Sequence, residues 1–272
     1  SKYRSVRSKT MQSLAETLRN ILKAKNGRQI GQNVQMTNIP PLPPICETCH
    51  SFGWVMRGDQ RIAEPCPSCR NVLQERKERL LQAANMPSFS AELGNTFDTF
   101  EVTTGKESAY DAAYEFANID HEYKVLTLVG PPGVGKSHLL EAVAWTYLGR
   151  GRSVRYEYAP TWLDKLRATY GDNPTQTYAQ VFGPQQNVDL LVLDDVGAER
   201  QTQYANEQLT KVIEARYNRT TDGVVAIATN HDQAQLAKHT HPRLVDRLFA
   251  YKTHARVAFL GGQLFRTGTQ WQ

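Results

Sequence analysis

Hydrophobic residues follow two spacings along the chain from about residue 123 onward. Short apolar runs predict β-strands at 123–129, 154–158, 190–193, 224–228 and 256–260. Between these runs, apolar residues recur every three or four positions, which predicts helices at 136–148, 161–170, 205–218 and 242–249. Apolar strands that alternate with amphipathic helices are typical of a mostly parallel sheet covered on both faces. The pattern therefore predicts a three-layer α/β domain.

The first third of the chain has a different pattern. Residues 11–25 place their apolar side chains on one face of a predicted helix, and the proline-rich stretch 39–44 predicts a stiff spacer. Residues 71–85 predict a charged helix that ends before Pro87. We therefore divide the chain into four parts: a basic arm with an amphipathic helix and a spacer at 1–45, a cysteine segment at 46–70, a helical linker at 71–95 and the α/β domain at 96–272.

Charge is concentrated at the N-terminal end. Residues 1–45 carry eight lysines and arginines against one acid, more than the net charge of +5 of the whole chain, so the remainder is slightly acidic. A basic arm suits nucleic acid or an acidic partner surface, and a solvated tail is the alternative. No apolar run approaches the roughly 18 residues of a membrane span, and the basic start lacks the apolar segment of a secretory signal. We therefore expect a cytoplasmic protein without a membrane partner.

All four cysteines lie in one stretch, as Cys46-x2-Cys49 and Cys66-x2-Cys69 with sixteen residues between the pairs. Paired C-x2-C turns at this separation match a four-thiolate zinc ribbon, and metal binding would supply folding energy that so short a segment lacks. Disulfides are a poorer alternative because nothing indicates an oxidising compartment, and unrelated buried cysteines rarely take this spacing. We predict structural Zn²⁺, since four thiolates leave no open coordination position.

The segment GPPGVGKS follows an apolar strand and opens a helix, which is the context that a G-x4-G-K-S phosphate-binding loop requires. Its glycines let backbone N–H groups turn toward phosphate oxygens, and the helix N-terminus adds its dipole. Lys136 is predicted to reach the terminal phosphates of ATP, and Ser137 is predicted to ligate Mg²⁺. The expected nucleotide-binding residues are Gly130, Pro131, Pro132, Gly133, Val134, Gly135, Lys136, Ser137, His138 and Asp194.

Polar side chains end two of the predicted strands. Asp194 and Asp195 stand at a carboxyl end, where open parallel sheets place their ligands. Asp194 is predicted to hold Mg²⁺, directly or through water, and Asp195 to orient or deprotonate the attacking water. Asn230 follows the strand 224–228 and is predicted to position water beside the γ-phosphate. Such an Asn alone is usually a turn residue, but the other two motifs favour a catalytic role with Lys136.

Four further motifs follow the phosphate loop in the order LLVLDDVGAE, EARYNR, ATN and RLVDRL, and FDTF precedes it at 97–100. Together with the tail FLGGQLFR and a cysteine ribbon containing GWV, this order resembles the AAA+ ATPases that load the replicative helicase, the DnaC/DnaI type. The resemblance covers about residues 86–267. The related IstB-type transposition proteins tend to carry Asp-Glu-Leu-Gly-Tyr where this chain has DDVGA, which favours the loader type.

The resemblance implies an arginine finger. Arg247 in RLVDRL matches the residue that reaches the ATP of a neighbouring subunit, with Arg243 as a second possibility. The alternative for Arg247 is a surface ion pair. One departure concerns Asp195, because many AAA+ proteins carry the longer Glu there; slow hydrolysis would suit a switch.

The resemblance also implies a contact with single-stranded DNA through the helix at 161–170. Lys165 and Arg167 would bind phosphates, and Trp162 and Tyr170 would stack on bases. Alternatively, Trp162 belongs to the core-facing side of that helix.

In the resembling family the N-terminal region binds the helicase. We therefore expect residues 1–70 to bind the replicative DNA helicase, and the ATPase to assemble as an open, hexameric spiral on single-stranded DNA with slow, partner-stimulated turnover. Two alternatives are a transposition regulator that forms filaments on duplex DNA and recruits a transposase, and a zinc adaptor that never hydrolyses its nucleotide. The intact Lys136, Asp194 and Asn230 argue against the adaptor.

Overall fold

The computed structural model describes residues 46–49, 54–57, 62–87, 94–118, 123–199, 202–218, 223–238, 240–249 and 255–262. The predicted helix over 11–25, the basic arm and the proline-rich spacer lie outside these ranges. The described elements are β1 (Trp54–Arg57), β2 (Ile62–Pro65), α2 (Arg70–Ala83), α3 (Glu107–Asn118), β3 (Val125–Val129), α4 (Lys136–Gly149), β4 (Val154–Tyr158), α5 (Ala159–Ala168), α6 (Tyr178–Asn187), β5 (Leu190–Val196), α7 (Gln203–Tyr217), β6 (Val224–Thr229), α8 (Gln233–Ala237), α9 (Pro242–Phe249) and β7 (Ala255–Phe259).

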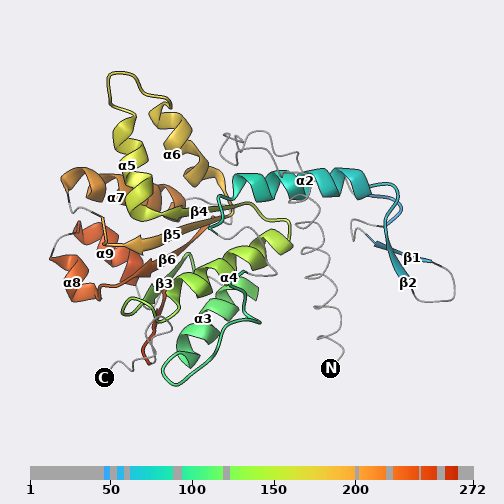
Figure 1. Ribbon diagram of the computed structural model, residues 1–272, viewed down its shortest axis with the longest axis horizontal. Coiled ribbons are helices and arrows are strands. Elements are labelled where there is room, and N and C mark those ends of the chain that lie inside the picture. Colours follow the sequence, from blue (N-terminus) through green and yellow to red (C-terminus); the bar gives the residue numbers. More distant parts are fainter. Residues whose placement is uncertain are drawn as a thin grey trace.

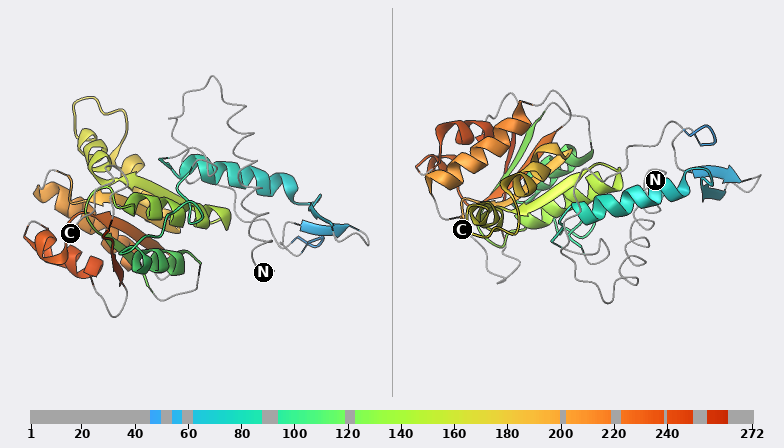
Figure 2. Two further views of the ribbon diagram at one scale, coloured as in Figure 1. Left: turned by 60° about the horizontal axis from the view of Figure 1, so that its bottom comes forward. Right: turned by 90° about the horizontal axis from the view of Figure 1, so that it is seen from above.

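Five parallel strands form the central sheet in the order β4-β5-β6-β3-β7, as Figure 1 shows. Alternate residues of each strand point to opposite faces, so Leu126 and Leu128 join one apolar core and Val125 and Val129 join the other. The first core packs against α3 and α4, and the second against α5 to α9 (Figure 2). The predicted three-layer α/β fold, with helices on both faces, is confirmed.

All five predicted strands and all four predicted helices of the domain are present, with ends shifted by a few residues. Sequence analysis missed α3, α6 and α8. Helix α6 contains Gly183 and Pro184, two residues that disfavour a helix interior, and the Thr177–Gln180 capping box starts it nonetheless. Helix α8 has five residues, too few for a periodic pattern. Within the described residues, none of the helices is long and apolar enough to cross a bilayer.

Helix α2 joins the cysteine segment to the α/β domain, and it projects from the domain with the β1–β2 hairpin at its far end (Figure 1). Its C-terminal end lies along β4, an edge strand whose outer polar groups need partners. The backbone N–H of Tyr156 donates to Ala84 O at 2.8 Å, and Asn85 Nδ2 donates to Tyr156 O at 2.8 Å. Leu80 of α2 is 2% exposed and joins the core beside α4. The end of α2 is therefore part of the α/β fold.

We predict that Asn85→Ala lowers the free energy of unfolding by about 2 kcal/mol. Asn85 has a φ of 54°, a left-handed conformation that Ala adopts poorly, and its amide also donates to Glu157 Oε2 at 3.2 Å. Asn85→Gly is the matched control because glycine accepts this φ and loses the side-chain hydrogen bonds alone. Denaturant unfolding of both variants separates the cost of backbone strain from the cost of the lost side-chain hydrogen bonds. Equal destabilisation of both would contradict the strain term, and an unchanged Asn85→Ala would contradict the anchoring role.

Candidate functional site

The phosphate loop connects β3 to α4, and its conformation depends on glycine at three positions. Gly133 and Gly135 have φ values of 83° and 107°, and Gly135 is the N-cap of α4. A Cβ on Gly130 would lie 2.3 Å from Leu260 O, so only glycine fits beside the end of β7. Backbone N–H groups at such a turn form a concave anion site at a helix N-terminus.

Lys136 is 7% exposed, and its ammonium group lies inside the loop. Nζ donates to Gly130 O at 2.8 Å, to Pro131 O at 2.8 Å and to Asn230 Oδ1 at 2.7 Å. Burial lowers the pKa of Lys136 to about 8, and the charges of Asp195 and Asp194 partly oppose that shift. These three neutral oxygens accept the N–H donors of Lys136 that would otherwise bind phosphate oxygens. The lysine is therefore held at the loop by hydrogen bonds that a phosphate can replace.

Asp194 lies at the end of β5, next to the first turn of α4. The hydroxyl groups of Ser137 and Tyr156 both hydrogen-bond its carboxylate, the latter at 2.9 Å to Oδ2. Burial raises the pKa of Asp194, and these two donors oppose the shift. A serine hydroxyl beside a buried carboxylate is a pair of hard oxygen ligands, which is the donor chemistry that Mg²⁺ requires. The structure thus brings Ser137 and Asp194 together as predicted, and the two residues fit the ion.

Asp195 departs from regular strand geometry. The ladder between β5 and β6 shifts register between Leu193 and Val196, and Asp195 has a φ of 59°. Asp195 Oδ1 accepts from Asn230 Nδ2 at 2.7 Å, and Oδ2 accepts from the Tyr158 hydroxyl at 2.9 Å. Bulges and left-handed residues of this kind re-aim a side chain and cluster at functional sites. The bond from Lys136 Nζ to Asn230 Oδ1 and the bond from Asn230 Nδ2 to Asp195 Oδ1 link these three residues in one hydrogen-bonded chain.

The ring of His138 lies against the loop that precedes α3. Its Nε2 is 2.9 Å from Thr96 O and 3.2 Å from Thr99 Oγ1, and its ring contacts Phe100 edge-on at 5.0 Å. The FDTF segment is thereby fixed to the first turn of α4. A direct contact between His138 and nucleotide stays a prediction.

Both candidate finger residues lie on α9. The guanidinium of Arg247 lies 4.0 Å from the ring centroid of Tyr217 and 3.7 Å from Asp246 Oδ2. Arg243 is 74% exposed and lies 3.9 Å from Glu214 Oε1. The aromatic face orients Arg247 in advance, whereas Arg243 is held weakly. The role of either residue across a subunit interface stays a prediction.

Helix α5 has an apolar face and an exposed charged face, on which Arg167 Nη1 donates to Asp164 Oδ1 at 3.0 Å. Trp162 is fully buried at 0% exposure with Leu163 and Leu166, so the expectation that Trp162 stacks on bases is wrong and the core alternative is correct. Lys165 and Arg167 are exposed. Tyr170, just beyond the helix, is 67% exposed. These three side chains are accessible, and their contact with DNA stays a prediction.

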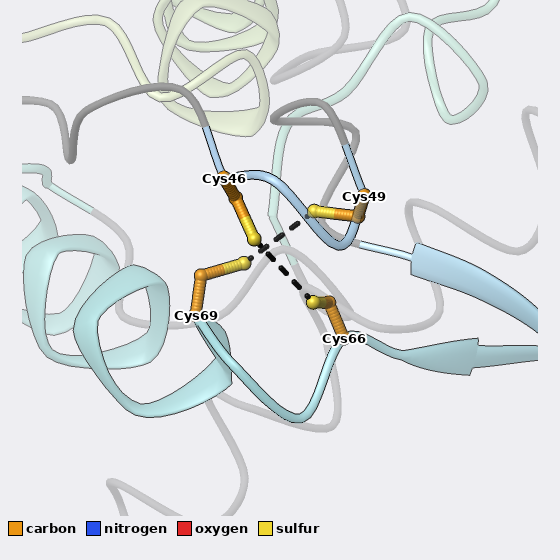
Figure 3. A group of neighbouring side chains, drawn as sticks. All are labelled: Cys46, Cys49, Cys66 and Cys69. Atoms are coloured by element: carbon orange, nitrogen blue, oxygen red, sulfur yellow. Dashed lines mark hydrogen bonds between the residues drawn. The ribbon is translucent and has the colours of Figure 1, made fainter.

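The four cysteines meet at the junction of the β1–β2 hairpin and α2 (Figure 3). All four Sγ atoms lie within 4.8 Å of one another; Cys46 and Cys66 are 3.7 Å apart and Cys49 and Cys69 are 3.6 Å apart. Tetrahedral zinc with bonds of about 2.3 Å separates its sulfurs by about 3.8 Å, whereas a disulfide requires about 2.05 Å. The cluster therefore fits zinc.

The thiols of the cluster differ in acidity. The backbone N–H of Cys49 lowers the pKa of the Cys46 thiol to about 6, whereas burial raises the pKa of the Cys69 thiol to about 12, so binding of zinc would release a proton from Cys69.

Sequence analysis missed the hydroxyl partners of the two acids, Tyr156 and Tyr158. The stretch VRYEY indicated a strand but gave no sign that its tyrosines would reach the end of the neighbouring strand. Glu199 was also missed: Gly197 N donates to its Oε2 at 2.8 Å, and burial raises its pKa. The two tyrosine contacts depend on strand order and register, which local sequence does not contain, whereas the Glu199 bond joins residues two apart.

The parallel sheet, the phosphate loop and the acid pair define a P-loop nucleotide-binding domain of the AAA+ class. Residues 70–258 match the family of IstB-like ATP binding proteins. This match spans well over half of the chain, and the chain belongs to that family.

The replicative helicase loader DnaC of Escherichia coli K12 is 24% identical over 155 residues, which cover 56% of this chain and 62% of the loader. An insertion sequence ATP-binding protein of Sinorhizobium fredii, y4pL, is 36% identical over 94 residues, covering 35% of this chain and 37% of that protein. The chain thus spans less than two thirds of the length of these relatives.

Solved structures show the same fold. The DnaC helicase loader aligns with a TM-score of 0.51 and 24% identity over 61% of this chain and 96% of that chain. DnaI aligns with a TM-score of 0.52 and 22% identity over 62% and 89%. The replication initiator DnaA, solved with AMPPCP and single-stranded DNA, aligns with a TM-score of 0.53 and 23% identity over 61% and 50%. The AAA+ prediction for the fold is confirmed.

We predict that the affinity for ATP falls as the pH rises through about 8. The charged form of Lys136 binds phosphate, and burial lowers its pKa to about 8 in the free chain. Affinity is therefore full below this value and falls about tenfold per pH unit above it, because binding must then take up a proton. Calorimetry between pH 7 and 9.5 measures the effect, with Lys136→Met as a weak-binding control whose profile is flat. A flat profile for the unmodified chain would contradict the prediction.

We also predict that the purified chain carries one Zn²⁺ and that Cys66→Ser loses it, because a buried thiolate ligand is removed. Thr48→Ala is the matched control, since Thr48 lies in the facing Cys46–Cys49 turn and bonds Ser68 rather than the metal site. Elemental analysis of both variants decides the matter. Zinc retained in Cys66→Ser at the unmodified stoichiometry, or equal loss in both variants, would count against a four-thiolate site.

Proposed function

We propose that this chain is an ATP-dependent loader of the replicative DNA helicase, with slow ATP hydrolysis that its partners stimulate. The observation that carries the chemistry is the chain of bonds from Lys136 through Asn230 to Asp195, because it connects the phosphate site to the residue placed to act on water. The client is inferred from the similarity to DnaC over 155 residues and from the DDVGAE stretch.

Each residue of the site has a part in this proposal. Lys136 exchanges the oxygens of Gly130 and Pro131 for phosphate oxygens. Ser137 and Asp194 hold Mg²⁺, which supplies positive charge at the phosphates. Asp195 orients the water and accepts its proton, and Asn230 aligns it. Asp195 is shorter than the Glu common at this position, which is consistent with a slow switch.

Oligomerisation completes the site in the proposal. Arg247 reaches into the nucleotide site of the next subunit of an open, hexameric spiral, with its guanidinium already oriented by Tyr217. Lys165, Arg167 and Tyr170 contact single-stranded DNA from the exposed face of α5 and the turn after it. Residues 1–70 bind the helicase, and α2 transmits that attachment to the ATPase domain.

A second candidate is a transposition regulator that assembles on duplex DNA. It is supported by the IstB-like family match over residues 70–258 and by the 36% identity to the insertion sequence protein y4pL. The two candidates share the ATPase chemistry and differ in the partner and in the nucleic acid.

The test is retention of the replicative helicase from the native host on the immobilised chain, with and without ATP. The full chain should retain the helicase, and a chain lacking residues 1–70 should lose it while still binding ATP, which shows that the shortened chain is folded. Arg247→Ala should retain the helicase but fail to release it on ATP addition. Equal retention by the shortened chain would reject the attachment site. Absence of helicase together with ATP-dependent filaments on duplex DNA would favour the transposition regulator.

A further inference from the structure

Two tyrosines of the edge strand β4 each contact one of the two acids. Tyr156 and Tyr158 are two residues apart, so their side chains leave the strand on the same face. Tyr158 is paired in register with Asp194 of β5, which brings both hydroxyls to the carboxyl end of the sheet. The hydroxyl of Tyr156 donates to Asp194 Oδ2 and that of Tyr158 to Asp195 Oδ2, each at 2.9 Å.

The acids need such support because the sheet does not orient them. The ladder is interrupted between Leu193 and Val196, and Asp195 has a φ of 59°, so its direction is not set by regular strand pairing. A carboxylate held at one oxygen can still turn, whereas one held at both oxygens cannot. Asn230 binds Oδ1 of Asp195 and Tyr158 binds Oδ2. Ser137 and Tyr156 similarly act together on Asp194.

A phenol suits this role better than a cation. Lysine or arginine would orient a carboxylate but would also neutralise it and compete with Mg²⁺. The hydroxyl donates without cancelling the charge. A phenol ordinarily titrates only at about pH 10, so both hydroxyl groups keep their protons and remain donors in the physiological pH range.

The strand that carries the tyrosines is itself fixed. The outward-facing N–H and C=O of Tyr156 bond to Ala84 and to the side chain of Asn85, so β4 cannot slide along β5 without breaking both bonds. The Tyr156 side chain is only 3% exposed, and that of Tyr158 is 46% exposed at the rim.

We propose that Tyr156 and Tyr158 are positioning residues of the ATPase site, with Tyr156 setting the Mg²⁺ ligand Asp194 and Tyr158 setting Asp195 for its work on water. The proposal rests on the nucleotide site described above and is independent of whether a helicase is the client. It predicts different defects for the two residues, because Asp194 acts through the metal and Asp195 acts on the attacking water.

The experiment compares Tyr156→Phe and Tyr158→Phe with Tyr178→Phe in the full chain without DNA. Tyr178 is the matched control because its hydroxyl donates to a side chain, Gln208 Oε1 at 2.6 Å, on the other side of the sheet. Three quantities are measured: ATP affinity in Mg²⁺ relative to that in EDTA, kcat and KM for hydrolysis, and the midpoint of thermal unfolding.

Tyr156→Phe should reduce the Mg²⁺-dependent gain in affinity about tenfold, and Tyr158→Phe should lower kcat about tenfold with KM within about twofold. Tyr178→Phe should match the unmodified chain in its Mg²⁺-dependent gain in affinity and in its kcat. Unchanged kcat in Tyr158→Phe, or an unchanged Mg²⁺ gain in Tyr156→Phe, would overturn the assignment. Should buried Tyr156→Phe unfold, half-exposed Tyr158→Phe carries the test alone.

Failure of the proposed hydrolysis is distinguishable from failure of the positioning role. An unmodified chain that binds ATP but never hydrolyses it would contradict the proposed activity. The Mg²⁺ gain in Tyr156→Phe would then decide the positioning role by itself.

Discussion

The burial of one positive charge organises the nucleotide site. Lys136 is almost removed from water, and this lowers its pKa, so the charge persists near neutral pH only because oxygens and carboxylates surround it. Parallel strands make this possible, because the carboxyl ends of β3, β5 and β6 meet at one edge of the sheet. The loop carbonyls, Asn230 and the acids thus come from segments far apart in sequence, and each lies within reach of the next.

This arrangement explains why the chain of bonds is a suitable switch. Asn230 accepts from Lys136 through its Oδ1 and donates to Asp195 through its Nδ2, so one side-chain amide bonds both the lysine and the acid. A phosphate that draws the lysine away frees the oxygen of Asn230 without touching Asp195. The acid remains held by Tyr158 and by the amide nitrogen, so Asp195, the residue that we propose for hydrolysis, stays in place while the lysine changes partners.

Sequence was sufficient for the layered fold and for several residues that the structure brings together at the end of the sheet, and the reasons are local. The phosphate loop depends on Gly133, Gly135 and a helix start, and buried strands appear as apolar runs. The side-chain contacts that sequence did not predict depend on how the strands pair and how the helices pack. The reach of Tyr158 to Asp195 follows from register, and the fully buried Arg216 bonds the carbonyls of Gln185, Asp189 and Val224, a set that exists only after folding. Trp162 was ambiguous because an aromatic residue on an amphipathic helix suits either face until the sheet is placed.

The cysteine segment and the ATPase domain are connected by more than a tether. The four sulfurs fix the start of α2, since Cys66 and Cys69 immediately precede it, and the end of α2 supplies Ala84 and Asn85 to the edge strand. The described core of the cysteine segment consists of the four cysteines and Val55, and the continuous helix α2 connects this small core to the domain. Because β4 is the strand that receives this helix and also the strand whose tyrosines bond both acids, the partner attachment and the nucleotide chemistry that we propose share one structural element.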